Sequence, residues 1–139
     1  MNNGLNPEKI VSIMYDNDLF SKWLGIEIIH ISKGNCILEM KVRKEMLNGF
    51  SIAHGGITYS LGDSCLAFAA NSYGVQCVSI ETSITHLKKV KENDVLKAIS
   101  KEKRVEETRA DYEIHITNQL NENVANFKGT VHRTNKEWK

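Results

Sequence analysis

One segment, residues 54–72, constrains the fold more than any other part of the chain, because it is apolar or small on nearly every side. Its stripe at helical spacing consists of Ile57, Leu61, Cys65 and Phe68. The other faces are largely filled by Leu66, Ala67, Ala69 and Ala70. A helix that is apolar nearly all round has to be buried. The rest of the chain must therefore wrap around this helix.

Strand patterns flank this helix on both sides. Residues 26–43 alternate between apolar and polar side chains around a turn at residues 33–35, which predicts a β-hairpin. Four more strand patterns follow Gly74, at residues 75–87, 94–104, 108–117 and 122–133, joined by short polar turns. In the last two, one face is formed by Ala110, Tyr112, Ile114, Ile116, Ala125, Phe127, Gly129 and Val131.

The N-terminal part is expected to be helical. Pro7, the only proline, suits a first helical turn, and the apolar spacing predicts a helix over residues 7–24, continuous or broken near Asn17. A helix, two strands, a buried helix and four strands with short turns predict an α+β fold, an antiparallel sheet curled around the central helix. No repeat or linker interrupts the chain, so we expect one domain over residues 1–139, with a polar tail that frays from about Thr134.

Composition excludes several functional classes. The 18 basic and 17 acidic residues balance, so no general positive field attracts nucleic acid or a membrane surface. Cys36, Cys65 and Cys77 lack CxxC spacing, which argues against a disulfide framework and a zinc site. The longest apolar run, residues 65–70, cannot cross a bilayer, and no signal-peptide pattern opens the chain. We expect a cytoplasmic protein without a metal site, and the missing phosphate-loop motifs argue against nucleotide hydrolysis and hydride transfer.

Two adjacent glycines, Gly55 and Gly56, stand at the start of the buried helix. The first turn of a helix carries unpaired N–H groups and a partial positive charge, so it can stabilise an oxygen that becomes negative in a transition state. An oxyanion hole at one of these amides is one interpretation. The alternative is that the glycines only tighten the turn, and the glycines alone favour that alternative.

Asp63 is the second candidate for chemistry. It lies two turns into the helix, nearly opposite the apolar stripe, among residues that are mostly apolar. An unpartnered carboxylate there is costly and would have a raised pKa, so it could serve as a general base or as a nucleophile. The equally supported alternative is a face that meets solvent or a second subunit.

The remaining polar candidates each have a simpler explanation. His54 could orient a carbonyl group, but its position favours a helix cap or a turn. Asn48, followed by Gly49, is first a turn signal and could also orient substrate or water. Lys88 and Lys89 could meet phosphates, although most such lysines are only solvated. The other histidines, at ordinary strand positions without metal-ligand spacing, are His30, His86, His115 and His132.

Taken together, these motifs resemble a known family, the PaaI-like (phenylacetic acid degradation) thioesterases of the hotdog fold. The resemblance rests on Met46-Leu47-Asn48-Gly49, His54-Gly55-Gly56, Tyr59-Ser60-Leu61-Gly62-Asp63 and Asn71-Ser72. It extends to residues 14–18, 24–26, 116–119 and 131–133, and so covers nearly the whole chain.

The resemblance implies hydrolysis of an acyl-coenzyme A thioester, with an arylacetyl or related acyl group. It implies that the Gly55 amide polarises the carbonyl, that His54 and Asn48 orient substrate or water, and that Asp63 attacks or activates water. It further implies a homodimer in which Asp63 of one subunit faces Gly55 of the other, commonly within a homotetramer. No separate cofactor is needed, because coenzyme A belongs to the substrate. The expected substrate-binding residues are Gly56, Phe50, Tyr59, Lys88 and Lys89.

The sequence departs from the family pattern at two places. Gly62 stands where many relatives have alanine, and residues 87–89 stand where many have arginine and proline, which puts the phosphate contacts in doubt. Two other functions stay open. A non-catalytic acyl-coenzyme A-binding module could use the same fold. An enoyl-coenzyme A hydratase would need an Asp and His pair, and no paired motif of that kind is found in the sequence.

Overall fold

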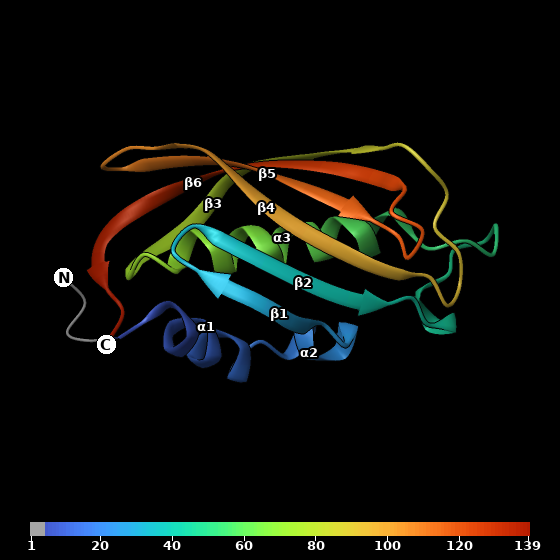
Figure 1. Ribbon diagram of the computed structural model, residues 1–139, viewed down its shortest axis with the longest axis horizontal. Helices are drawn as coiled ribbons and strands as arrows, with labels where there is room; N and C mark the ends of the chain where they lie inside the picture. Colours follow the sequence, from blue (N-terminus) through green and yellow to red (C-terminus); the bar gives the residue numbers. More distant parts are fainter. Residues whose placement is uncertain (1–4) are drawn as a thin grey trace.

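The computed structural model of the protein describes residues 5–139 (Figure 1). Its helices are α1 (Pro7–Asp16), α2 (Leu19–Leu24) and α3 (Gly55–Asn71), with a short 3-10 turn η1 (Lys44–Met46). Its strands are β1 (Glu27–Ser32), β2 (Asn35–Lys41), β3 (Val75–His86), β4 (Val95–Val105), β5 (Arg109–Thr117) and β6 (Asn123–Glu137). No helix within residues 5–139 is long and apolar enough to span a membrane.

The N-terminal helical region is divided at Asn17, one of the two predicted possibilities. Asn6 caps α1, where its side chain accepts a hydrogen bond from the Lys9 amide at 2.8 Å. Asp18 caps α2 in the same way, and α2 ends at Gly25, whose φ of 74° lies in the left-handed region. Each segment therefore has its own start signal, which explains why one long helix does not form.

The six strands form one antiparallel sheet in the order β1-β2-β4-β5-β6-β3, so β1 and β3 are its edges. Figure 1 shows this sheet arching over α3, while α1 and α2 lie on the other side of that helix. The predicted inward-facing positions are buried, including Leu38 in β2, Ile114 in β5 and Phe127 in β6. The predicted hotdog arrangement is confirmed.

Helix α3 is buried on the predicted stripe but not all round. Ile57, Leu61, Cys65 and Phe68 are all buried. A second stripe, which is only half-buried, consists of Tyr59, Ser60, Asp63, Ser64 and Ala67. One side of the helix is thus incompletely covered within a single chain, and Asp63 lies on it.

The C-terminal residues correct one expectation, since the tail does not fray from Thr134. Strand β6 continues to Glu137 and pairs with the start of β3. The Thr134 hydroxyl donates to the Gln76 carbonyl at 2.7 Å, and the Trp138 indole donates to Asn71 Oδ1 at 3.0 Å. These bonds anchor a polar segment that has little apolar pattern of its own.

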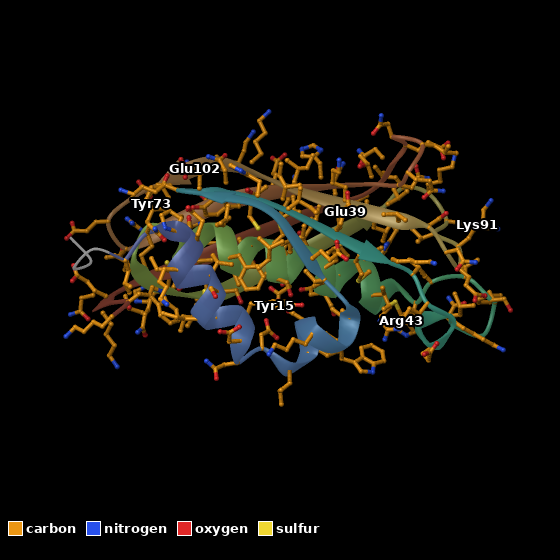
Figure 2. All side chains as sticks on the ribbon, turned by 60° about the horizontal axis from the view of Figure 1, so that its bottom comes forward. Tyr15, Glu39, Arg43, Tyr73, Lys91 and Glu102 are labelled. Atoms are coloured by element: carbon orange, nitrogen blue, oxygen red, sulfur yellow. The ribbon has the colours of Figure 1, made fainter. Side chains whose placement is uncertain are left out.

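The two ends of the molecule differ in their side chains. Figure 2 shows Arg43 and Lys91 near one end, and Tyr73 and Glu102 close together near the other. The Tyr73 hydroxyl donates to the Glu102 carboxylate, and burial together with this bond raises the pKa of Tyr73 to about 12. That end of the molecule is held together by hydrogen bonds between side chains.

Candidate active site

A cavity of about 360 Å³ lies at the N-terminus of α3. It joins the loop before α3 to the end of β3 and the residues that follow. Its lining residues are Asn48, Ile52, Ala53, Gly55, Thr58, His86, Leu87, Lys88, Lys89 and Val90. Four residues predicted from the sequence therefore meet in one place: Asn48, Gly55, Lys88 and Lys89.

The two glycines at the start of α3 have different roles. The Gly56 amide donates to His54 Nδ1 at 2.8 Å, so it is committed to the helix cap and is not available to a ligand. The Gly55 amide has no hydrogen-bond partner within residues 5–139. This free N–H lies in the first turn of a 17-residue helix, at the positive end of its dipole. Gly55 is therefore the amide that can bind an anion or a polarised carbonyl oxygen.

His54 is the N-cap of α3, the role that its position favoured. Because its Nδ1 accepts a hydrogen bond from Gly56, the neutral ring must carry its proton on Nε2. The imidazole thus keeps a second N–H donor on an exposed side chain, although His54 does not line the cavity. The cap fixes the ring and its tautomer with one interaction.

Asn48 organises the turn that leads into α3. Its Oδ1 accepts from the Phe50 amide at 2.8 Å, and its backbone amide donates to the Ile52 carbonyl at 2.7 Å. The predicted turn is confirmed. Within the described residues its Nδ2 group has no partner, which leaves a side-chain donor at the cavity wall.

His86 enters the cavity although its strand pattern predicted an ordinary histidine. A Cβ atom added to Gly55 would lie 3.3 Å from His86 Nε2, so the ring packs against the bare backbone of Gly55. His86 Nδ1 lies 3.5 Å from the Thr58 hydroxyl, which donates to the Gly55 carbonyl at 3.0 Å. The side chain is exposed, so a ligand bound at Gly55 would meet it.

The lengths of α3 and of the strand that follows it indicate from the sequence that His86 can reach this site. Helix α3 advances about 25 Å over its 17 residues. A returning strand covers that distance in about eight residues, at about 3.3 Å each. Strand β3 has 12 residues, so it is long enough for its end to return to the start of α3.

The two lysines of the cavity are not equivalent. Lys88 Nζ forms an ion pair with the carboxylate of Glu122, on the turn before β6. This ammonium group, together with Asn118, lowers the pKa of Glu122. No acidic partner is found for Lys89 in the described part of the chain. Lys89 is thus the freer positive charge at the cavity.

Asp63 lies outside this cavity. Burial, and then the charge of Asp18, raise the pKa of the Asp63 carboxyl group. It is eight residues beyond Gly55, which on an α-helix is about 12 Å along the axis. A reacting carbonyl must lie within about 3 Å of both its oxyanion donor and its attacking group. The Gly55 amide and the Asp63 carboxylate of one chain therefore cannot act on the same carbonyl.

Two other predicted binding residues lie elsewhere on the surface. Phe50 projects from the loop before α3 with 85% of its area exposed. The Tyr59 hydroxyl is hydrogen-bonded to the Thr82 hydroxyl on β3, and its ring meets the Phe127 ring edge-on. Neither side chain lines the cavity at Gly55, so their contact with substrate stays a prediction.

Gly62, the neighbour of Asp63, departs from the family pattern for a visible packing reason. A Cβ atom at Gly62 would lie 2.7 Å from Phe127 Cγ and 2.8 Å from its Cδ2. Phe127 is fully buried, so its ring has no free space to move into. The glycine lets this ring pack directly on the helix backbone.

A second hollow, of about 570 Å³, lies on the outer face of the sheet. Two ion pairs lie among its charged side chains, Lys103 with Glu113 and Arg109 with Asp111. It lies away from the start of α3 and contains none of the predicted catalytic residues. We therefore place the candidate site at Gly55.

Comparisons with known proteins identify the family. The thioesterase superfamily profile matches residues 50–125. The acyl-coenzyme A thioesterase PaaI of Escherichia coli is 38% identical over 120 residues, which cover 86% of each chain. The solved structure of E. coli PaaI has a TM-score of 0.92 and 34% identity, over 94% of this chain and 95% of that chain. A hypothetical thioesterase of Streptococcus pneumoniae, solved with coenzyme A, has a TM-score of 0.84 and 28% identity, over 90% of this chain and 99% of that chain. The chain therefore belongs to the thioesterase superfamily, as a PaaI-like member with the hotdog fold.

Proposed function

We propose that the protein hydrolyses acyl-coenzyme A thioesters, at a site formed by the Gly55 amide of one subunit and the Asp63 carboxylate of another. The observation that carries this proposal is the unpaired Gly55 amide in a cavity at the start of α3. The family supplies the class of reaction, thioester hydrolysis. The separation of about 12 Å along one helix supports a site to which two chains contribute one group each.

In the proposed reaction the thioester carbonyl oxygen accepts a hydrogen bond from the Gly55 amide, which stabilises the oxyanion that forms. Asp63 of the partner subunit either removes a proton from the attacking water or attacks the carbonyl carbon itself. In the second route water then cleaves the resulting anhydride. Both routes consume one water, break the carbon–sulfur bond, and release a carboxylic acid and coenzyme A. The Nε2 proton of His54 and the Nδ2 group of Asn48 are available to orient the substrate or the water.

The edge strand β3 is the surface through which we propose that two subunits pair. It is 12 residues long, and among residues 5–139 no strand pairs with its outer side. Val78 and Ile80 on this strand are 56% and 62% exposed. A long apolar edge strand is a site for strand pairing with another chain. A homodimer, and a homotetramer of two such dimers, follow from the resemblance to the family.

The proposed substrates are acyl-coenzyme A thioesters with phenylacetyl, hydroxyphenylacetyl or related acyl groups. The support is the similarity to E. coli PaaI, an acyl-coenzyme A thioesterase whose solved structure is described as coming from the phenylacetic acid degradation operon. We propose Lys89 as the main phosphate contact, because Lys88 is engaged by Glu122. A cytoplasmic location and the absence of a metal or other cofactor stay predictions.

The test is release of free coenzyme A from phenylacetyl, hydroxyphenylacetyl, benzoyl and straight-chain acyl thioesters. The wild type is compared with Asp63→Ala. We expect turnover on the aryl substrates and its loss in the variant, with the fold preserved by circular dichroism. Near-normal kcat in Asp63→Ala would contradict the mechanism. Tight binding of acyl-coenzyme A without any thiol release would instead indicate the non-catalytic module, and a change in enoyl absorbance would indicate the hydratase.

A further inference from the structure

The ring of His86 is oriented by the first turn of α3. The Thr58 hydroxyl donates its single proton to the Gly55 carbonyl at 3.0 Å, so toward His86 its oxygen can only accept. His86 Nδ1 lies 3.5 Å from that oxygen and therefore carries the proton of the neutral ring. The other ring nitrogen, Nε2, is then an acceptor, and it has no hydrogen-bond partner within residues 5–139.

This acceptor differs from the other polar groups that the cavity offers to a ligand. The Gly55 amide and the Asn48 Nδ2 group are N–H donors, and Lys89 carries a positive charge. Asn48 Oδ1 already accepts from the Phe50 amide. Among the described side chains that line the cavity, His86 Nε2 is thus the one acceptor that is not already used. It lies close to the carbonyl site, since a Cβ atom added to Gly55 would be 3.3 Å from it.

A thioester held at Gly55 brings few donors near this lone pair. Its carbonyl oxygen and the phosphates of coenzyme A accept hydrogen bonds, so neither can pair with another acceptor. The first donor beyond the sulfur is an amide N–H of the pantetheine arm, two methylene groups away. Lys88 and Lys89 follow His86 closely in the chain and line the same cavity. An arm that runs from Gly55 toward the positive charge of Lys89 therefore passes the His86 ring.

We propose that His86 is a specificity-determining residue, whose Nε2 accepts a hydrogen bond from the pantetheine amide nearest the thioester. This inference rests on the proposed function and names the part of the substrate that His86 recognises. The site then selects thioesters whose thiol carries an N–H group at this position. It rejects those with an oxygen there, because the lone pair of Nε2 would face a second acceptor.

The test compares two short thioesters of the same acid. One is formed with N-acetylcysteamine, which keeps the amide N–H, and the other with the acetate ester of mercaptoethanol, in which an ester oxygen replaces that N–H. The wild type should prefer the amide in kcat/KM by about fivefold, the effect of one hydrogen bond. His86→Ala should hydrolyse the two at equal rates. Thr85→Ala, on the opposite face of β3, is the matched control and should keep the preference.

The outcomes separate this inference from the proposed function. If the wild type shows no preference for the amide, or if His86→Ala keeps it, His86 does not bind the pantetheine amide, even though the protein is a thioesterase. Full turnover in Asp63→Ala would instead overturn the proposed mechanism, whatever the preference between the two thioesters.

A second readout does not depend on turnover. Nitrogen NMR of histidine-labelled protein shows which ring nitrogen carries the proton, with the His86 resonances assigned by their loss in His86→Ala. We expect a protonated Nδ1 and an unprotonated Nε2 in the neutral ring, and a change in the Nε2 chemical shift when coenzyme A is added. A neutral ring with its proton on Nε2, or an Nε2 resonance that coenzyme A leaves unchanged, would overturn the inference.

Discussion

The Gly55 amide can be removed by a single substitution, Gly55→Pro, because of the local backbone. Gly55 is the first residue of α3, a position where proline is favoured. His54 before it has φ −60° and ψ 138°, the extended conformation that a residue preceding proline prefers. The lost N–H has no partner within residues 5–139, so folding sacrifices no internal hydrogen bond. We expect the free energy of unfolding to change by less than about 1 kcal/mol.

The effect of Gly55→Pro on catalysis should be much larger. One oxyanion donor is worth about 3 kcal/mol in the transition state, so kcat should fall about a hundredfold. Gly55→Ala is the matched control. It adds a Cβ atom that meets His86 Nε2 at 3.3 Å, as proline does, but it keeps the N–H group.

Steady-state release of coenzyme A from the best acyl substrate measures kcat and KM for both variants. The prediction is that Gly55→Pro loses about a hundredfold more kcat than Gly55→Ala, because a donor used in the transition state is missing. If the two variants have kcat values within a few-fold of each other, the Gly55 amide is not the oxyanion donor.

Two further substitutions test packing and the cavity. Gly62→Ala should lower the free energy of unfolding, measured by urea denaturation, by up to about 2 kcal/mol. Overpacking against Phe127 costs about 1–3 kcal/mol, and the higher helix propensity of alanine offsets about 1 kcal/mol of that cost. In a Phe127→Leu background Gly62→Ala should become stabilising. If Gly62→Ala alone stabilises the protein, the packing argument is contradicted. His86→Ala should lower kcat/KM about fivefold, which corresponds to the loss of one hydrogen bond of about 1 kcal/mol. Thr85→Ala, on the opposite face of β3, is the control and should leave kcat/KM unchanged. Equal kinetics for the two β3 variants would remove His86 from the site.

Much of the fold could be predicted from hydrophobic periodicity. The stripe of α3 and the inward positions of β2, β5 and β6 are buried as the pattern requires, because one face of each element must leave water. The end of β6 was missed because Asn135 and Lys136 carry no apolar alternation. Its order comes from pairing with β3 and from the Trp138 contacts, which depend on distant parts of the chain.

The part of the candidate site that is formed by one continuous segment could be predicted from the sequence. Asn48 and Gly55 belong to one continuous loop and helix start, so local sequence brings them together. His86 reaches the cavity because β3 runs back along α3, and Lys88 meets Glu122 because β3 lies beside β6 in the sheet. Hydrophobic periodicity encodes neither contact. The commitment of the Gly56 amide to His54 depends on one rotamer of the cap and could not be read from residue types.

The most direct test of the shared active site is complementation between two inactive variants. Gly55→Pro chains lack the donor and Asp63→Ala chains lack the carboxylate, so neither homodimer is expected to be active. If equal amounts are unfolded together and refolded, half of the dimers are mixed, and one of the two sites in each is intact. About a quarter of wild-type activity should return if subunits pair with two-fold symmetry. No recovery, in a mixture that light scattering shows to be dimeric or tetrameric, would contradict a site shared between subunits.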